Sequence, residues 1–319
     1  MYKEFFGLAE YPFSLTPDPR FIVPNARYNE MLAGLCYGIE MAKGLMVLTG
    51  EVGTGKTTAV RWILNRLDRG VRAAYIFNPH LSIEEFYHQL TEGLLIGDWN
   101  NKADLLSQLG ALLKIRHNRG LRTIVIIDEA HELSDQVLEE VRLLLNFESD
   151  TAKHLQVILT GQPELRERLR QPNLRQLKQR IAVRCVMPIL SDMDETERYI
   201  VERLRIAGAP DTGIFTRGAV EMIHICSEGI PRQVNNLCDN AMVAAYGAGV
   251  SSVERKLIED IADNLDMLPS ELFTAGAETE SKSSVRAFDP VKRDELIDVV
   301  ERDLLRTHPQ DETSEKAIS

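Results

Sequence analysis

One eight-residue motif constrains this chain more than any other part of its sequence. It fits the phosphate-binding (Walker A) pattern G-x-x-x-x-G-K-[ST] at every fixed position, in the run Gly50-Glu51-Val52-Gly53-Thr54-Gly55-Lys56-Thr57. An apolar run at 45–48 precedes the motif and predicts a buried strand. A helix-compatible stretch from 57 to about 67 follows it. A strand, a glycine-rich loop and a helix form the setting in which this motif binds phosphate groups.

The residue types of the motif predict ATP and Mg²⁺ as ligands. Glycines let backbone N–H groups turn inward around the β- and γ-phosphates. Lys56 adds a point charge, and the hydroxyl of Thr57 is a suitable Mg²⁺ ligand. The positive end of the helix dipole faces the same anion.

Two adjacent carboxylates, Asp128 and Glu129, end a second apolar run at 123–127. If that run is a parallel strand beside the loop strand, Asp128 supports the Mg²⁺ ion and Glu129 orients and polarises the attacking water. The same pair could instead cap the helix that follows. His131 has two interpretations, as a side chain supporting the carboxylates or as the first turn of that helix.

Apolar strands alternate with helical patterns over the first 188 residues, which predicts a doubly wound α/β fold with a parallel sheet. The expected strands are 45–48, 73–77, 123–127, 155–159 and 182–186. The expected helices are 27–43, 57–67, 82–95, 102–118 and 134–146. An aromatic and proline-rich arm, 1–26, precedes this core of 27–188 and is expected to be extended.

Strand patterns stop after Pro188, and helical patterns at 192–207, 216–227, 231–246 and 253–264 predict a small all-α domain over 189–268. Residues 269–319 are rich in Ser, Glu and Asp and predict a mostly disordered acidic tail. Within the tail, 290–306 is either a short docking helix for a partner or a marginal helix on a solvated segment.

Length and composition agree with a soluble protein of two domains. The chain has 319 residues, of which 44% are hydrophobic, and a net charge of −11. That charge argues against nucleic-acid binding over the whole surface, although it leaves room for a local basic patch. The four cysteines form no C-x-x-C pair, and no apolar run is long enough for a membrane span. We therefore expect a cytoplasmic protein.

Several further motifs accompany the two described above along the chain. They are Phe6-Gly7-Leu8, Pro12-Phe13, Thr16-Pro17-Asp18-Pro19, Ile127-Asp128-Glu129-Ala130-His131, Leu159-Thr160-Gly161-Gln162-Pro163-Glu164-Leu165, Gln179-Arg180-Ile181 and Gly229-Ile230-Pro231-Arg232. Over roughly residues 1–268, this set resembles the AAA+ ATPases of the ExeA/GspA (general secretion pathway protein A-like) family. The resemblance implies an AAA+ core followed by a helical lid, and activity as a Mg²⁺-dependent ATP hydrolase.

The resemblance also implies roles for individual residues. Thr160 or Gln162 is the polar "sensor 1", Arg180 is an arginine finger that reaches the γ-phosphate of a neighbouring subunit, and Arg232 is the "sensor 2" that contacts the γ-phosphate within its own subunit. Arg175 is the alternative to Arg180. The catalytic set is thus Glu129, Lys56, Arg180, Arg232 and Thr160. The nucleotide-binding set is Gly50, Glu51, Val52, Gly53, Thr54, Gly55, Lys56, Thr57, Thr58, Asp128 and Arg232, and the metal ligands are Thr57 and Asp128.

The aromatic arm around Phe6 to Phe13 and the helix after Arg27 have two interpretations. By resemblance they wall the adenine pocket, whereas core packing explains the same aromatic residues equally well.

Partners follow from the resemblance as well. It implies a homo-oligomer, as a ring or a filament, that remodels or regulates a protein partner of a secretion or export machinery. Long family members continue into a transmembrane segment and a peptidoglycan-binding domain, and this chain is similar to the short form without them. The alternative is a DNA-associated ATPase of the transposition-regulator (TnsC/MuB-like) type, for which 166–170 and 174–180 are locally basic. Those stretches are equally explained as a subunit interface or a solvated helix.

Overall fold

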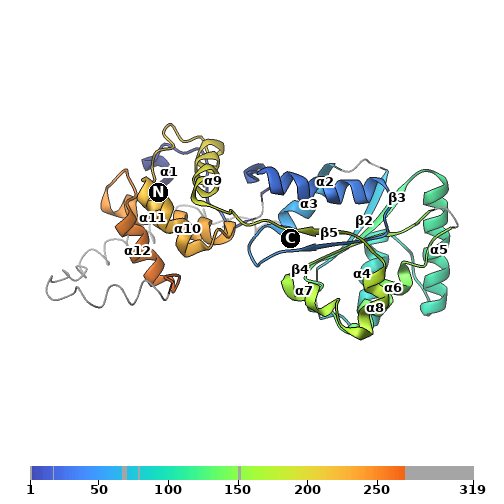
Figure 1. Ribbon diagram of the computed structural model, residues 1–319. Helices are drawn as coiled ribbons and strands as arrows, with labels where there is room; N and C mark the ends of the chain where they lie inside the picture. The colour runs from blue at the N-terminus through green and yellow to red at the C-terminus, as the bar shows by residue number, and fades with distance from the viewer. Residues whose placement is uncertain (1, 17, 67–69, 78–79, 150–151, 270–319) are drawn as a thin grey trace, which may run out of the picture. The chain divides into compact units, whose positions relative to one another are not determined.

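The computed structural model describes residues 2–16, 18–66, 70–77, 80–149 and 152–269. Within them, one parallel sheet has the strand order β2-β3-β4-β1-β5 (Figure 1). Its strands are β1 (Leu45–Thr49), β2 (Val71–Ile76), β3 (Arg122–Ile127), β4 (Gln156–Gly161) and β5 (Ile181–Val186). The strands β1, β3 and β4 are buried almost throughout, because both faces of the sheet are covered.

The strand register decides which loops meet. In the β1–β4 pair Thr49 lies opposite Gly161, and in the β3–β4 pair Ile127 lies opposite Leu159. All strands run the same way, so the segments that follow them gather at one edge of the sheet. The phosphate-loop motif, Asp128 and Gln162 therefore share this carboxyl edge.

Helices cover both faces of the sheet and continue beyond it. They are α1 (Tyr2–Phe5), η1 (Pro19–Phe21), α2 (Ala26–Glu40), α3 (Lys56–Arg66), α4 (Ile83–Leu94), α5 (Lys102–Asn118), α6 (Asp135–Leu144), α7 (Pro163–Arg168), η2 (Pro172–Leu174), α8 (Arg175–Gln179), α9 (Met193–Ile206), α10 (Arg217–Ser227), α11 (Pro231–Ala248) and α12 (Arg255–Asn264). The helices α2 and α3 pack on one face of the sheet, and α4, α5 and α6 pack on the other (Figure 1).

A third apolar cluster joins the helices α9 to α12 with the N-terminal arm. Phe6 and Phe13 are buried in it, and Phe21 of η1 completes its contact with α9. Core packing is therefore the correct interpretation of Phe6 and Phe13. The division of the chain near residue 188 stays a proposal, and the separation of this cluster from the two clusters of the sheet supports it.

The predicted α/β fold with a helical part is confirmed, with local differences. The helix expected over 27–43 ends at Glu40, because Ala42 (φ 48°) and Gly44 (φ 80°) turn the chain into β1. The short helices α7 and α8 were not predicted, since six and five residues give too little periodicity. The arm is also not fully extended, because Tyr2–Phe5 is helical. The predicted tail, 269–319 with a helix at 290–306, lies outside the described residues except for Pro269.

Candidate nucleotide-binding site

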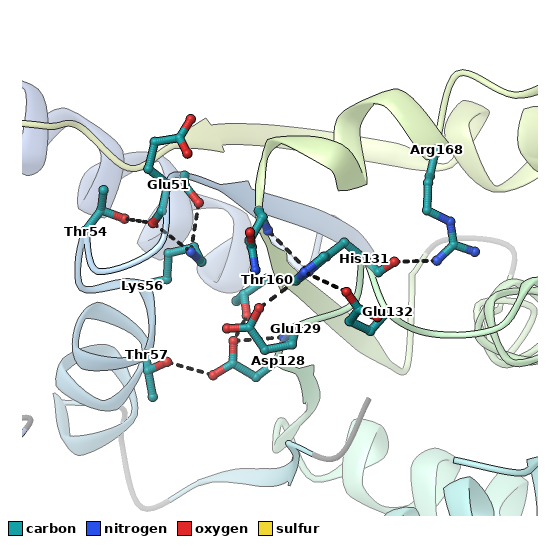
Figure 2. A network of polar contacts seen from close by, with 12 residues as sticks. Glu51, Thr54, Lys56, Thr57, Asp128, Glu129, His131, Glu132, Thr160 and Arg168 are labelled. Atoms are coloured by element: carbon teal, nitrogen blue, oxygen red, sulfur yellow. Dashed lines mark hydrogen bonds and ion pairs between the residues drawn. The ribbon is translucent and has the colours of Figure 1, made fainter. Parts of the chain in front are cut away.

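The phosphate-loop motif connects β1 to α3, as the sequence predicts. Gly53 and Gly55 have φ angles of 82° and 95°, a conformation that favours glycine. The ammonium of Lys56 donates to the carbonyl oxygens of Gly50 (2.8 Å) and Glu51 (3.0 Å), as Figure 2 shows in part. Burial lowers the pKa of Lys56, against the attraction of nearby carboxylates led by that of Glu129. A cation thus lies inside the curve of the loop.

The carboxylate of Asp128 accepts hydrogen bonds from three hydroxyl groups. The hydroxyl of Thr57 donates to Oδ2 at 2.8 Å, and that of Thr160 donates to Oδ1 (Figure 2). The hydroxyl of Tyr75 also donates to Oδ2, at 2.5 Å. Burial raises the pKa of Asp128, but the hydrogen bonds, led by that of Thr160, outweigh it and hold the pKa below its usual value. Asp128 is therefore charged at neutral pH.

Thr57 and Asp128 together fit a hard divalent cation. Both offer oxygen ligands, and their side chains are in contact. Mg²⁺ in phosphate-binding sites is usually held by one or two protein oxygens, with phosphates and water as the other ligands. In the described part of the chain there is no cluster of three or more His, Cys, Asp or Glu side chains arranged around a metal position.

Glu129 follows directly after Asp128 in the chain, but its side chain has different surroundings. It adopts a left-handed backbone conformation, with φ at 49°, which is unusual for a residue with a side chain. Its side chain lines the same cavity as Lys56 and Thr57. One carboxylate oxygen, Oε2, is buried and has no hydrogen-bond partner among the described residues, although Nδ1 of His131 lies 3.4 Å away (Figure 2).

His131 lies in the loop between β3 and α6, because α6 begins only at Asp135. The interpretation of His131 as the first turn of that helix is therefore wrong. Its ring is buried, Nδ1 accepts the backbone N–H of Gln162 at 3.4 Å, and Nε2 lies 3.4 Å from a carboxylate oxygen of Glu132. His131 thus ties the loop that carries Glu129 to the end of β4.

Two residues that hold the site together were missed in the sequence. Tyr75 on β2 is one of the three donors to Asp128. Arg168 on α7 donates to the carbonyl oxygen of His131 at 2.6 Å (Figure 2). It also donates to the carbonyl oxygen of Leu133 at 2.6 Å and so holds the loop after β3 in place. Tyr75 could have been found from the sequence, because a tyrosine near the end of a predicted strand lies close to the edge of the sheet where the site is expected. Arg168 gave no such signal, because its role depends on how α7 packs.

The predicted "sensor 1" residues do not line the cavity. Thr160 is buried against Asp128, and Gln162 contacts the loop after β3 through its backbone N–H, which donates to His131. The position of Thr160 makes it a support for the carboxylate.

Arg180 lies far from its own phosphate loop. It precedes β5, and Ile181 pairs with Leu45 at the beginning of β1, whereas the loop follows the end of β1. Five residues of strand separate these edges by about 16 Å. The guanidinium donates to the carbonyl oxygen of Leu145 (3.2 Å) and to Oδ1 of Asn146 (2.7 Å), at the end of α6.

A cavity of about 280 Å³ extends from the loop to the helical part of the chain. Its lining includes 52–57 of the motif, Thr58, Glu129, and Arg232 at the start of α11. The backbone N–H of Arg232 donates to the carbonyl oxygen of Gly53 at 3.2 Å. A Cβ atom on Gly53 would lie 2.6 Å from Cβ of Arg232, so a glycine is required for this approach. Tyr28 of α2 also lines the cavity, whereas Phe6 and Phe13 do not.

Comparisons with known proteins agree with this geometry. A family model described as an AAA domain matches residues 39–169. General secretion pathway protein A of Aeromonas hydrophila is 42% identical over 259 residues, which cover 78% of this chain and 46% of that protein. The chain thus spans about half the length of this relative. None of the helices in the described ranges has the length and apolar character needed to cross a membrane.

Solved structures share the fold at low sequence identity. The Aeropyrum pernix ORC2 protein superposes with a TM-score of 0.61 and 17% identity, covering 85% of this chain and 75% of that one. Cdc6p of Pyrobaculum aerophilum gives 0.59 and 16%, covering 83% and 73%. The RuvB branch migration motor of Thermotoga maritima gives 0.51 and 16%, covering 74% and 69%.

The fold and the site define a P-loop protein of the AAA class. Within that class, the chain belongs to the ExeA/GspA-like AAA ATPases, the relatives of General secretion pathway protein A.

The hydrogen bond from Thr160 to Asp128 gives a pH-dependent prediction. We expect Thr160→Val to lower the free energy of unfolding by about 1–2 kcal/mol near pH 7, because a buried charge loses a donor. The folded-state pKa of Asp128 is depressed, so this contribution exists above the unfolded pKa of about 4 and is lost as the pH falls below it. Urea unfolding of both proteins between pH 3 and 7 measures the difference.

Thr91→Val is the matched control, since the hydroxyl of Thr91 is also buried but donates to the carbonyl oxygen of His88 in its own helix. Its effect should not change with pH. A pH-independent effect of Thr160→Val would contradict the assignment.

Proposed function

We propose that this protein binds ATP with Mg²⁺ and hydrolyses it. Lys56 and the N–H groups of the loop bind the β- and γ-phosphates, and Glu129 orients and polarises the attacking water. The observation that carries the proposal is the position of Glu129. Glu129 lines the same cavity as Lys56 and Thr57 and directly follows the charged Asp128.

Thr57 and Asp128 would hold the Mg²⁺ ion, directly or through water, because they present charged and neutral oxygen ligands side by side. The ion supplies positive charge against the phosphate oxygens. Thr160 and Tyr75 keep Asp128 ionised and fixed in direction. Arg232 would contact the γ-phosphate within the same subunit, since it begins α11 directly beside Gly53.

We further propose that the site is completed between copies of the chain, in a ring or a filament. Arg180 lies at the opposite edge of the sheet from its own phosphate loop, which supports a role toward a neighbour's nucleotide and not toward its own. Its charge would then stabilise the transition state of that neighbour. Arg175, the alternative, is exposed, and its side chain makes no hydrogen bond or ion pair within the described residues.

The proposed task of the ATPase is to remodel or regulate a protein partner of a secretion or export machinery in the cytoplasm. This part of the proposal is based on the similarity to General secretion pathway protein A, of which the chain covers 46%.

A second candidate is a DNA-associated ATPase of the transposition-regulator type. It is favoured by four exposed cations on α7, α8 and the segment between them, which make no ion pair in the described part of the chain: Arg166, Arg170, Arg175 and Lys178. Such a patch binds phosphates by charge in spite of the acidic total.

The two candidates differ in their response to DNA. We measure steady-state ATP hydrolysis against protein concentration, with and without duplex DNA. For the protein-partner ATPase we expect specific activity to rise with concentration, because neighbours complete the site, and DNA to have no effect. A large stimulation by DNA that disappears in high salt would favour the second candidate.

Glu129→Gln should bind ATP as the wild type does but lose turnover by about 10²- to 10⁴-fold, because an amide does not accept a proton from water. Calorimetric titration with ATP and a phosphate-release assay measure the two properties. Lys56→Ala is the companion variant and should lose ATP affinity, since it removes the cation in the loop. Normal hydrolysis by Glu129→Gln would remove Glu129 from the mechanism.

Arg180→Ala should bind ATP yet hydrolyse it slowly, and mixing it with Glu129→Gln should restore activity. In a one-to-one mixture, about a quarter of the interfaces combine an intact Glu129 with a neighbour's intact Arg180. Asn146→Ala is the control, because it removes an internal partner of Arg180 but keeps the arginine. The absence of rescue at every mixing ratio would count against action across an interface.

A further inference from the structure

A buried imidazole lies between two carboxylates at the carboxyl edge of the sheet. The side chain of His131 is only 6% exposed, and its two ring nitrogens face different residues (Figure 2). Nδ1 lies 3.4 Å from Oε2 of Glu129, and Nε2 lies 3.4 Å from Oε1 of Glu132. Glu129 lines the cavity, whereas His131 and Glu132 do not. The imidazole therefore contacts Glu129 from a side other than that of the cavity.

The backbone on both sides of this ring is held by hydrogen bonds to α7 and β4. The carbonyl oxygen of His131 accepts from Arg168 at 2.6 Å. The N–H of Ala130 donates to the carbonyl oxygen of Thr160 at 2.7 Å. A Cβ atom on Gly161 would lie 3.3 Å from the backbone nitrogen of His131, so β4 passes close to the loop. The ring is thus a fixed neighbour for the side chain of Glu129.

One oxygen of Glu129 depends on this neighbour. Oε2 is buried and accepts no hydrogen bond from the described residues, although the side chain as a whole is 40% exposed. Buried polar atoms without a partner are rare in folded proteins. A proton on Nδ1 of His131 would supply the missing donor. Because a carboxylate is planar, a donor that holds Oε2 also decides where Oε1 points.

A second group competes for the same ring nitrogen. The backbone N–H of Gln162 also lies 3.4 Å from Nδ1. A neutral imidazole has one protonated nitrogen and one nitrogen with a free lone pair. Nδ1 therefore either donates to Glu129 or accepts from Gln162, and the tautomer decides which. Gln162 directly precedes α7, and Arg168 is its last residue, so both ends of this helix reach the ring or its backbone.

We propose that His131 is a positioning residue for Glu129. With its proton on Nδ1, the imidazole donates to Oε2 and leaves Oε1 to face the attacking water in the cavity. With its proton on Nε2, the ring pairs with Gln162 and Glu132, and the carboxylate of Glu129 is released. A shift of α7 that withdraws the N–H of Gln162 therefore favours the first arrangement. The inference rests on the proposed function, since it requires Glu129 to act on water.

The first test compares turnover with ATP affinity. His131→Phe keeps a planar ring but removes both nitrogens. We expect kcat to fall about tenfold, because a hydrogen bond to a charged group is lost. Calorimetric affinity for ATP with Mg²⁺ should be unchanged, because His131 does not line the cavity. His131→Asn should recover most of the lost turnover, because its amide N–H comes close to the place of Nδ1.

A double-mutant cycle separates positioning from a general structural role. In the Glu129→Gln background, His131→Phe should slow phosphate release no further, because the imidazole acts only through the carboxylate of Glu129. His154→Phe is the matched control. It removes another histidine with a buried ring nitrogen, two residues before β4 and so at the opposite edge of the sheet. This variant should hydrolyse ATP as the wild type does.

Three results would overturn the inference alone. They are wild-type turnover in His131→Phe, the same loss in both backgrounds, and a loss of ATP affinity as large as the loss of turnover. Normal hydrolysis by Glu129→Gln would overturn the proposed function as well. Thermal unfolding checks the fold. If His131→Phe is unfolded, His131→Gln replaces it with the same expected loss, because its amide comes close to the place of Nε2 and not of Nδ1.

The position of the proton gives an independent readout. Nitrogen NMR spectra of protein with labelled histidines distinguish a protonated from an unprotonated ring nitrogen, and the signals absent from His131→Phe identify His131. In the presence of Mg²⁺ and a non-hydrolysable ATP analogue, we expect a proton on Nδ1. A proton on Nε2 alone in this state would overturn the inference.

Discussion

The burial of one carboxylate, that of Asp128, imposes the arrangement around the carboxyl edge of the sheet. Taking an ion of this kind out of water costs several kcal/mol unless donors replace the water. The donors come from three elements, β2, α3 and β4, of which only α3 and β2 follow each other in the chain. The strand order supplies them, since β3 lies between β2 and β4. The strand order of the sheet is therefore what allows a charged carboxylate to be buried at this site.

The cavity depends on a second constraint, the close approach of α11 to the phosphate loop. The approach is possible because Gly53 has no side chain, and the N–H of Arg232 makes use of it. The cavity walls thus come from segments far apart in the sequence, with the phosphate loop on one side and the arm, α9 and α11 on the other. A ligand that contacts both sides adds its binding free energy to the contact between them.

Sequence patterns predicted the parts of this molecule that depend on neighbours along the chain. The phosphate loop, the buried strands and the carboxylate pair are local patterns, and they lie where they were expected. The roles of Tyr75 and Arg168 depend on partners 53 and 37 residues away. No local pattern encodes such a partner, because it is created by the order of strands and the packing of short helices.

Thr160 illustrates the intermediate case. Its importance was predicted from resemblance, but its contact was not, since its side chain is buried against Asp128. The arm is similar, because its aromatic residues were recognised as anchors while the surface that they anchor to became visible only in the fold.

The contacts of Arg180 at the end of α6 have a consequence for assembly. Both of its acceptors, a carbonyl and an amide oxygen, are neutral. If the arginine leaves these acceptors for another molecule, it exchanges one set of hydrogen bonds for another. The free energy gained is only the difference between the two sets. The guanidinium is already charged, so an ionised acceptor adds a charge–charge attraction that its present neutral acceptors lack, and the exchange is favourable toward a highly charged group. Whether the arginine leaves its internal acceptors therefore depends on how much negative charge the neighbour carries.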